Sequence, residues 1–314
     1  MNKLKEKKEL ILKQVEKKLT FQDVEWSKDV VKRLKESVSN GKMVRGSLFL
    51  RTYELLGGKE DVLDTALAIE LVHNTLCVHD DVMDKDEFRR GKQTMHKQYE
   101  SIVSDTHYGY SMAICVGDVG FFKSFSLFDK RVMDIVSVEL EKCGYGQMQD
   151  IHLAYSSREP TKEQIIDVYR HKTARYTFSM PMMLAARIAN SYVDLFSKLG
   201  ENLGIIFQII DDDIGIFGDL KEIGKTPGSD IVENKKTLHR YFLLEKYPEF
   251  KKYFGTKVSA KELDLIKEKM LEIKPKIQKI LNHHQQEANK LIEKLPCDKT
   301  FFEELSNYNL SRLK

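Results

Sequence analysis

The stretch VLDTALAIELVHNTLCVHDDVMD, residues 62–84, joins an apolar run to three aspartates at its end. The chain has no proline before Pro160, so long unbroken helices are permitted, and we expect one helix over this stretch. On that helix Asp80, Asp81 and Asp84 share one face, because residues three and four apart are neighbours. Like charges at this spacing repel one another, and a bound divalent cation would reverse that effect. The stretch therefore predicts a helix that ends in a Mg²⁺ site.

Basic residues follow the three aspartates within one charged segment. Asp86 and Glu87 give way to Arg89, Arg90 and Lys92. Mg²⁺ commonly bridges carboxylates to substrate phosphates, and arginine forks bind phosphate oxygens. Carboxylates beside arginines therefore predict a diphosphate site. On this segment alone, a solvated acidic helix end followed by a basic loop stays an open alternative.

A second acidic cluster follows another apolar run. The helix expected over residues 192–217 carries Asp211, Asp212 and Asp213 directly after its apolar part. The helix macrodipole disfavours acids near a C-terminus, so a purely structural explanation requires an unfavourable placement. We expect this helix to deliver carboxylates to the mouth of a cavity; a helix terminus with a surface loop is the alternative. Asp219, Asp230 and Glu233 extend the cluster, and Lys225, Lys235 and Lys236 add positive charge.

The rest of the chain shows helical spacing and little of the two-residue alternation that is typical of strands. Residues 2–19 form a basic amphipathic pattern, which we interpret as a packing or dimer helix rather than a membrane-surface helix. No fixed-period repeat or low-complexity linker divides the sequence. We therefore predict an all-α fold in one domain over residues 1–314. Further helices are expected near residues 104–128, 131–155, 161–172, 174–190 and 192–217, with a glycine-rich loop over 218–228.

Composition excludes several classes of protein. Lys and Arg number 51 against 48 Asp and Glu, and a net charge of +3 is too small for a general nucleic-acid binder. No run approaches the roughly 18 apolar residues of a membrane span, and the N-terminus lacks the apolar region of a secretory signal. Four cysteines without metal-ligand or redox spacing indicate free thiols in a reducing compartment. We expect a cytoplasmic protein with no nucleic-acid partner and no integral membrane association.

As a set, these motifs resemble those of the trans-prenyl diphosphate synthases, the family of farnesyl and geranylgeranyl diphosphate synthases, from about Gly41 to Lys236. The resemblance implies the all-α helical bundle of the isoprenoid synthase type, with a central active-site cavity. The family's first aspartate-rich motif matches Asp80-Asp81-Val82-Met83-Asp84. The other matches are Lys42, Arg45, His73, Arg89-Arg90-Gly91, Gly146-Gln147 with Asp150, Lys172-Thr173, Phe207-Gln208, Asp211-Asp212, Lys225 and Lys235.

The sequence departs from the family's pattern in both motif regions. Met43 and Gly46 replace an arginine and a proline of the first loop, and Gln93 stands where proline is common. Gly215 stands where the second motif has its third aspartate. Asp213 would face away from Asp211 on a helix and is a poor substitute. We therefore expect weaker chelation of one metal ion, not loss of activity.

The resemblance implies head-to-tail condensation of isopentenyl diphosphate with an allylic diphosphate, by ionisation, condensation and proton loss. No protein nucleophile is needed, because Mg²⁺ and surrounding cations stabilise the departing diphosphate. The resemblance also implies a homodimer and three Mg²⁺ ions per site with substrate bound, with Asp80, Asp84 and Asp211 as ligands. The resemblance implies that the allylic diphosphate is held by Arg89, Lys172, Lys225 and Lys235. Isopentenyl diphosphate would be held by Lys42, Arg45, His73 and Arg90. Asp81 and Asp212 belong to the acidic motifs, and the dipoles of Thr173 and Gln208 would lie near the carbocation.

Product length is expected to depend on the helix that precedes Asp80, because the growing tail should run along it away from the metal. Each five-carbon unit spans about one helical turn, roughly 5 Å. The first residues that the tail meets are Leu76 and Thr75, and neither is aromatic. Aromatic residues at these positions stop the product short in the family, so we predict a twenty-carbon product, geranylgeranyl diphosphate. Tyr108, Ser111 and Met112 of the neighbouring helix would form the floor of the tail site.

Other functions stay open at this point. A longer-chain polyprenyl diphosphate synthase would use the same residues. A non-catalytic subunit of a heteromeric prenyl synthase could tolerate a change such as Gly215. His79-Asp80 is an HD dyad, as in all-α metal-dependent phosphohydrolases, but that site leaves Lys42 and Arg45 unexplained. A class I terpene cyclase would have no use for a second diphosphate site.

Overall fold

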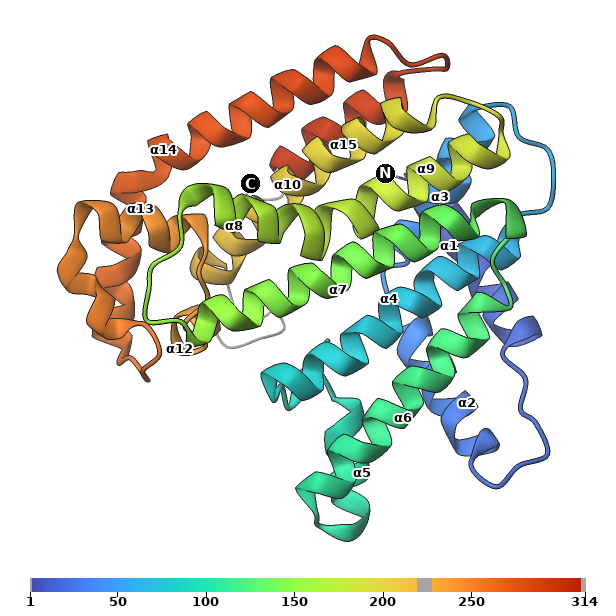
Figure 1. Cartoon of the computed structure of the whole chain (residues 1–314), viewed down its shortest axis with the longest axis horizontal. Coiled ribbons are helices and arrows are strands. Elements are labelled where there is room, and N and C mark those ends of the chain that lie inside the picture. The colour runs from blue at the N-terminus through green and yellow to red at the C-terminus, as the bar shows by residue number, and fades with distance from the viewer. Residues whose placement is uncertain (1, 219–227, 312–314) are drawn as a thin grey trace. The chain divides into compact units, whose positions relative to one another are not determined.

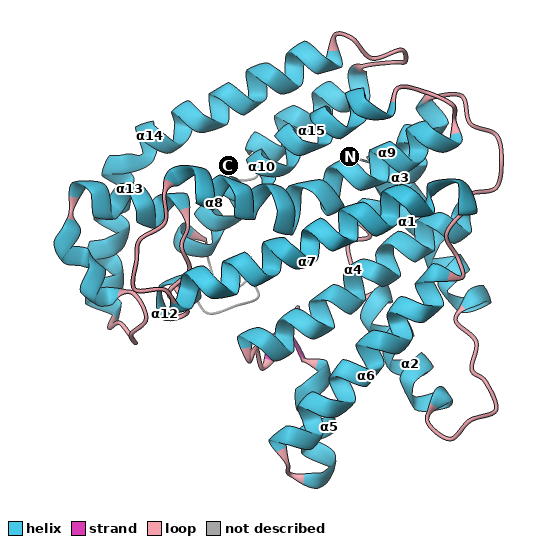
Figure 2. Ribbon diagram, viewed as in Figure 1, coloured by secondary structure: helices cyan, strands magenta, loops and turns pink. Residues whose placement is uncertain are grey.

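The stretch 62–84 forms helix α4 (Leu63–Asp84), as the sequence predicts. This computed structural model describes residues 2–218 and 228–311, which are almost entirely helical (Figures 1 and 2). The predicted all-α class is confirmed. The strands found in the described part of the chain are β1 (Phe88–Arg89) and β2 (Lys92–Gln93), which pair as one short antiparallel hairpin.

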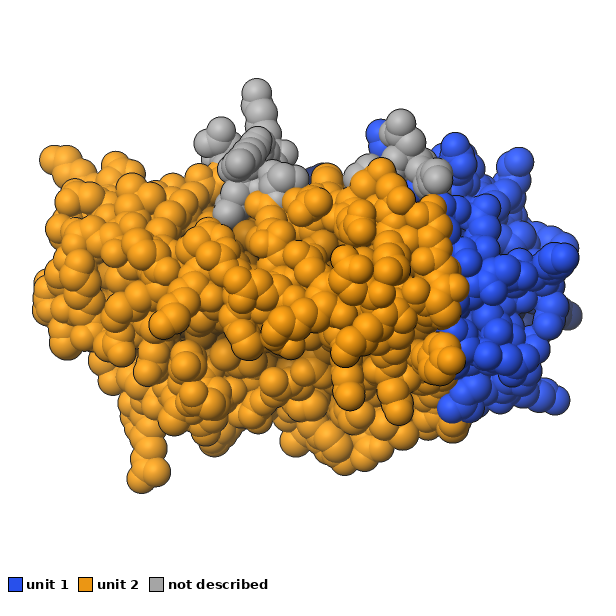
Figure 3. Space-filling model, turned by 90° about the horizontal axis from the view of Figure 1, so that it is seen from above, with its two compact units in different colours: residues 1–133, 184–191 blue, residues 134–183, 192–314 orange. Residues whose placement is uncertain are grey.

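The chain packs as two compact units, coloured separately in Figure 3. Unit 1 comprises residues 1–133 and 184–191, and unit 2 comprises residues 134–183 and 192–314. One domain over residues 1–314 stays a prediction, because two such units can belong to one domain. Besides α4 and the hairpin, unit 1 holds α1 (Asn2–Lys18), α2 (Ser27–Ser39), α3 (Val44–Leu55), α5 (Met95–Val103), α6 (Thr106–Phe125) and the 3-10 helix η1 (Lys130–Val132).

Unit 2 is built around the long apolar helix α10 (Val193–Phe217). Its buried residues Ile205, Ile206 and Ile209 join a core that includes Leu238 and Ile277. The other elements are α7 (Met133–Tyr155), α8 (Lys162–Val168), the π-helix η2 (Tyr169–Ser179), α9 (Met180–Ile188), which crosses into unit 1, α12 (Ser229–Val232), α13 (Leu238–Lys246), η3 (Pro248–Tyr253), α14 (Ala260–Ile292) and α15 (Thr300–Ser311).

In unit 1, α4 contacts α3 and α6 at short range because glycines remove side chains from the contacts. A Cβ at Gly46 of α3 would lie 2.6 Å from the carbonyl oxygen of Ala66, and a Cβ at Gly120 of α6 would overlap the hydroxyl of Thr75. Contacts this close leave the helix little freedom to rotate. They therefore fix the direction in which the carboxylates at the end of α4 point.

The helices differ from the prediction at several places, and α2 falls in no predicted helix. The sequence predicts separate helices near residues 161–172 and 174–190, but α8, η2 and α9 follow one another without a break. The middle segment is a π-helix, in which the N–H of Met180 reaches back five residues to the carbonyl of Arg175. Helix α5 lies where no helix was predicted. The π-helix has no periodicity signal of its own, because tertiary packing decides it, whereas in α5 the buried Met95 and Tyr99 have helical spacing.

Within residues 2–218 and 228–311, no single helix is both long enough and apolar enough to cross a membrane. The segments Thr106–Phe125 and Lys130–Tyr155 meet those limits only when they are taken together as a broken pair.

His284 on α14 contributes a pH-dependent part of the stability of unit 2. Its Nδ1 lies 2.8 Å from Oδ1 of Asn202 on α10, and burial, together with the neighbouring His283, lowers its pKa to about 4. The unfolded histidine has a pKa of about 6.5, so its stabilising contribution is full above that pH and is lost as pH falls towards 4.

Lowering the pH from 6.5 to 4 should reduce the free energy of unfolding of the wild type. We predict that this reduction is about 2 kcal/mol smaller in His284→Gln, a value that allows for the partial exposure of His284. Urea unfolding of both proteins across this pH range measures the difference. Parallel pH profiles for wild type and variant would contradict the prediction.

Candidate active site

The first aspartate-rich segment ends α4, and the hairpin folds back onto it. The two residues that connect β1 to β2, Arg90 and Gly91, both have positive φ, which is the geometry that tight hairpins favour. The hairpin returns Arg89 to the helix: its Nε donates to Asp81 Oδ1 at 2.5 Å, and its Nη2 lies 3.6 Å from Asp80 Oδ2. The acidic and basic halves of the segment therefore form one site.

The three carboxylates of this segment are not equivalent. Asp81 is only 3% exposed, and burial raises its pKa to about 6 even though Arg89 acts against that shift. Asp80 and Asp84 are partly exposed and lie one helical turn apart on the same side of α4. Asp81 thus holds Arg89 in place, whereas Asp80 and Asp84 form the accessible pair.

A pair of carboxylates one turn apart fits Mg²⁺, which binds a few protein oxygens and completes its shell with water and phosphate oxygens. Among the described residues, no group of three or more His, Cys, Asp or Glu side chains forms a metal site by itself. The donor set therefore fits an ion that is shared with a bound diphosphate, rather than a structural ion held by protein ligands alone.

A basic pocket of about 70 Å³ lies in unit 1, and its lining includes His73, Asp81, Arg89 and Arg90. Burial, together with the positive charges of Arg45, Arg90 and Arg89, lowers the pKa of His73 well below its ordinary value. His73 is therefore neutral at physiological pH and can donate a hydrogen bond without adding charge. The predicted residues His73, Arg45, Arg89 and Arg90 are thus brought together.

The loop before α3 carries the other predicted diphosphate ligand of unit 1. Lys42 is exposed there, next to Met43, which has a φ of 51°. A Cβ at Gly41 would lie 3.2 Å from Nη1 of Arg90, so the loop and the hairpin are neighbours. Gly46 donates its N–H to the buried Glu70 at 2.7 Å, a bond that the proline expected at this position could not make.

The structure separates the two residues predicted to limit chain length. Thr75 is fully buried in the contact with Gly120 of α6, and its hydroxyl has no hydrogen-bond partner among the described residues. Leu76 is partly exposed, as are Tyr108 and Met112 of α6. Of the two positions, Leu76 is therefore the one with an accessible side chain.

In unit 2, the three aspartates at the end of α10 point in different directions. Asp211 is exposed. Asp212 is buried and accepts hydrogen bonds from Tyr169 and from Gln208, the latter at 2.8 Å. Asp213 is buried on another side, 2.8 Å from His239 Nε2, so it faces away from Asp211, as its spacing predicts. Asp211 is the carboxylate of this cluster that is accessible to a metal ion.

A carboxylate from another segment lies at the position of the missing third aspartate. A Cβ at Gly215 would lie 3.1 Å from Oδ2 of Asp230, a residue of α12. Burial, followed by the charge of Asp230, raises the pKa of Asp212 well above its ordinary value, which is consistent with this proximity. Gly215 thus makes room for the side chain of Asp230.

The predicted cationic residues of unit 2 lie on two segments. Lys172 and Thr173 are partly exposed on η2, and Lys172 Nζ forms an ion pair with Asp150 of α7. Lys235 Nζ lies 2.9 Å from Glu233 and 3.7 Å from Asp230. Lys225 and Asp219 fall outside the described residues.

Sequence reasoning missed the buried partners of these residues. Tyr169 and His239 bind Asp212 and Asp213, and Arg175 on η2 binds Glu139 and Glu201. Each pair joins positions more than twenty residues apart, so no local spacing could reveal it.

Residues 26–273 match the model of the polyprenyl synthetase family. The chain belongs to the polyprenyl synthetase family. The trans-prenyl synthase resemblance drawn from the motifs is thereby confirmed at the level of the family.

Curated relatives and solved structures support the family and its fold. The chain is 35% identical to a geranylgeranyl diphosphate synthase of Saccharolobus solfataricus over 64% of this chain and 61% of that protein. It is 34% identical to a short chain isoprenyl diphosphate synthase of Methanocaldococcus jannaschii over 68% of this chain and 65% of that protein. The matched region thus spans less than two thirds of either relative.

Two crystal structures share the fold over nearly the whole chain. A geranylgeranyl pyrophosphate synthase from Corynebacterium glutamicum, complexed with isoprenyl diphosphate and magnesium, has a TM-score of 0.90 at 24% identity and covers 98% of this chain and 99% of that one. A geranylgeranyl pyrophosphate synthetase from Pyrococcus horikoshii has a TM-score of 0.77 at 28% identity and covers 98% of this chain and 97% of that one. The fold of this chain is that of the polyprenyl synthetases.

Restoring an aspartate at position 215 would place a carboxylate against Asp230. We predict that Gly215→Asp is less stable than Gly215→Asn, which adds the same volume without charge, by about 1 kcal/mol at low ionic strength. Thermal unfolding of both variants in metal-free buffer measures the difference, which added salt should reduce. Equal stability of the two variants at low salt would mean that Asp230 does not lie at this position.

Proposed function

We propose that this chain is a Mg²⁺-dependent prenyltransferase that condenses isopentenyl diphosphate with an allylic diphosphate and forms geranylgeranyl diphosphate. One observation carries the proposal: within unit 1, Asp80 of the accessible pair lies 3.6 Å from Arg89, which also lines the basic pocket that contains His73. Carboxylates for a metal beside donors for phosphate oxygens are what a diphosphate substrate requires. Family membership and the names of the relatives support the same reaction.

The proposed metal ligands are Asp80, Asp84 and Asp211. Their exposure supports this choice, since Asp81, Asp212 and Asp213 are each buried against a protein partner. We propose three Mg²⁺ ions per site with substrate bound, and Asp230 as the carboxylate that takes the place of the missing third aspartate. Bound Mg²⁺ would supply the positive charge that favours departure of the allylic diphosphate.

The protein's own groups would bind and orient the two substrates. Neutral His73 would donate a hydrogen bond to isopentenyl diphosphate, and the charges of Arg45, Arg90 and Lys42 would balance that diphosphate. Arg89 would face the allylic diphosphate while Asp81 keeps its guanidinium oriented. On unit 2, Lys172, Lys235 and Lys225 would bind the allylic diphosphate, and the dipoles of Thr173 and Gln208 would lie near the carbocation.

We further propose a homodimer in the cytoplasm. Exposed apolar side chains on α6 and α7, among them Phe122, Phe125 and Met148, support a protein partner for these helices. The cysteines Cys77, Cys115, Cys143 and Cys297 are thiols rather than disulfides, which suits a reducing compartment. Light scattering of the purified chain tests the dimer, and a monomeric mass would overturn that part of the proposal.

Product analysis tests the function. Purified protein is incubated with Mg²⁺, labelled isopentenyl diphosphate and, in turn, dimethylallyl, geranyl and farnesyl diphosphate. We expect a twenty-carbon product, and we expect Asp80→Asn to lower the rate by roughly a hundredfold or more. Glu87→Gln, an exposed charge in the same segment, is the control and should keep the wild-type rate.

Other outcomes have definite meanings. A longer product would identify a longer-chain polyprenyl diphosphate synthase. No condensation by a correctly folded protein would favour the non-catalytic subunit of a heteromeric enzyme.

Product length tests the tail site separately. We predict that Leu76→Phe shortens the main product, because Leu76 is accessible, and leaves the thermal stability nearly unchanged. Thr75→Phe should instead destabilise the protein by about 1–3 kcal/mol, because Thr75 is fully buried against Gly120. Product chromatography and thermal unfolding measure the two effects. An unchanged product from Leu76→Phe would refute the role of α4 in setting chain length.

A further inference from the structure

The π-helix η2 carries Lys172 and Thr173, the proposed ligands of the allylic diphosphate. Eleven residues of π-helix are unusual, because π-turns are rare and mostly occur as single turns at functional sites. An α-helix of the same length would turn these side chains in other directions. Some interaction must therefore hold this segment in its wider register.

One face of α7 contacts η2 along its length. Glu139, Cys143, Gly146 and Asp150 are four, three and four residues apart, so they form a single stripe on α7. Cys143 Sγ donates to the carbonyl of Lys172 at 3.5 Å, and a Cβ at Gly146 would overlap the backbone of Lys172. Asp150 pairs with Lys172 Nζ.

Glu139, at the N-terminal end of this stripe, binds Arg175 through two hydrogen bonds. Arg175 Nε and Nη2 each lie 2.7 Å from an oxygen of Glu139, which is 2% exposed. Burial alone would raise the pKa of Glu139, but the bonds from Arg175 outweigh it, and the pKa falls below its ordinary value. Glu139 therefore stays ionised, and the pair is a charged contact inside the unit.

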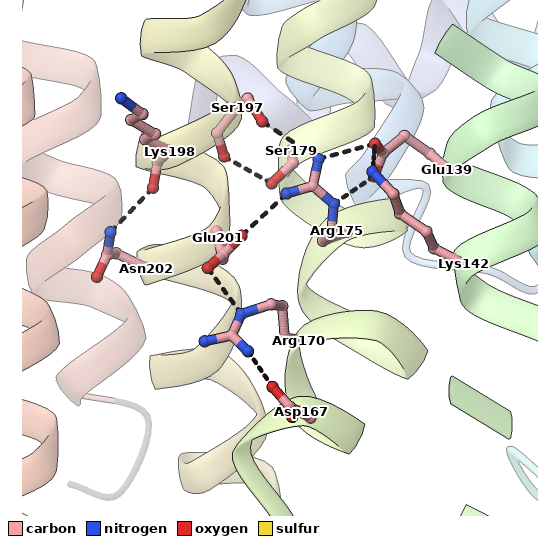
Figure 4. Close-up of polar contacts among 10 residues, drawn as sticks. All are labelled: Glu139, Lys142, Asp167, Arg170, Arg175, Ser179, Ser197, Lys198, Glu201 and Asn202. Atoms are coloured by element: carbon pink, nitrogen blue, oxygen red, sulfur yellow. Dashed lines mark hydrogen bonds and ion pairs between the residues drawn. The ribbon is translucent and has the colours of Figure 1, made fainter. Parts of the chain in front are cut away.

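Helix α10 contacts the opposite side of η2 and is bound by the same arginine (Figure 4). Arg175 Nη1 donates to Glu201 at 2.9 Å, and Arg170 Nε donates to the other oxygen of Glu201 at 2.8 Å. Glycines of α10 allow the backbones to touch: a Cβ at Gly204 would overlap Ala174. Arg175 is thus bonded to α7 and to α10 at once.

Stability alone is a weak reason for a buried charge cluster, because apolar residues of similar volume often replace one without loss. The attested use of such clusters is to select one register among several. At Arg175, a one-residue slip of η2 would break the bonds to both Glu139 and Glu201. The same slip would move Lys172 away from Asp150.

We propose that Arg175 is a positioning residue that fixes the register of η2 and thereby directs Lys172 and Thr173 towards the allylic diphosphate. The inference rests on the proposed function for the identity of that ligand. The placement of Lys172 itself does not depend on the proposed function. It can therefore be tested without catalysis.

The main variant is Glu139→Leu with Arg175→Met, which removes the charged pair without leaving a buried charge. We expect the KM for the allylic diphosphate to rise roughly tenfold or more, whereas the KM for isopentenyl diphosphate changes by less than about twofold. Arg175→Lys keeps the charge but not the planar fork, and it should give a smaller increase in the same KM. Thermal unfolding checks that each variant is folded.

Mass-spectrometric amine labelling tests the placement of Lys172 directly. The labelling rate of Lys172 is measured relative to that of Lys290, a reference lysine on α14. In the double variant we expect this relative rate to rise severalfold, because the ion pair of Lys172 with Asp150 is lost. Arg170→Met is the matched control: Arg170 also binds Glu201, but its bonds go to Glu201 and Asp167 and not to α7. It should leave Lys172 labelling within about twofold of wild type.

Three results would overturn the inference. One is unchanged Lys172 labelling in the folded double variant or, if that variant does not fold, in Arg175→Lys. A second is an equal rise in KM for both substrates. The third is an Arg170→Met effect as large as that of the double variant. If the wild type does not condense the substrates, the proposed function fails, and the labelling still decides whether Arg175 positions Lys172.

Discussion

Acids in the last two turns of apolar helices are the constraint on which the proposed metal ligands of each unit depend. The helix macrodipole disfavours negative charge there: α4 ends at Asp84, and α10 carries Asp211, Asp212 and Asp213 four to six residues before its last residue, Phe217. Within each unit, protein groups compensate the buried acids: Arg89 binds Asp81, and His239 lies against Asp213. The acids that remain accessible are those at which a cation would relieve the repulsion that is left. Electrostatics inside each unit thus separates structural carboxylates from candidate metal ligands.

Close backbone packing then determines where these groups point. Gly120 brings α6 against α4, and Gly146 brings α7 against η2, so neither helix can rotate without a steric clash. The cost is a narrow tolerance for larger side chains at these contacts. The benefit is that a side chain such as Lys172, for which a binding role is proposed, is held by backbone position as well as by an ion pair.

The sequence predicted the parts of the molecule that local pattern controls. The bounds of α4 agree with the prediction to within one residue, and the outward face of Asp80 and Asp84 follows from their spacing. The position of Thr75 in the sequence gives its angle around the helix axis but not the residue that packs against it. The contact of Thr75 with Gly120 could therefore not be predicted. The π-helix and the approach of Asp230 to Gly215 depend on segments far apart in the chain. Such contacts leave no periodic signal in one sequence.

Two side chains bear on the competing functions. His79 Nε2 lies 3.2 Å from the carbonyl of Ile114 and 3.7 Å from Asp118, so its ring is turned towards α6 and not towards a metal beside Asp80. A phosphohydrolase of the HD type needs that histidine as a ligand. Gly215 would favour a non-catalytic subunit if it left the second motif short of a carboxylate. A Cβ at Gly215 would lie 3.1 Å from Oδ2 of Asp230, so the second motif still has a carboxylate at this place, as the proposed catalytic function requires.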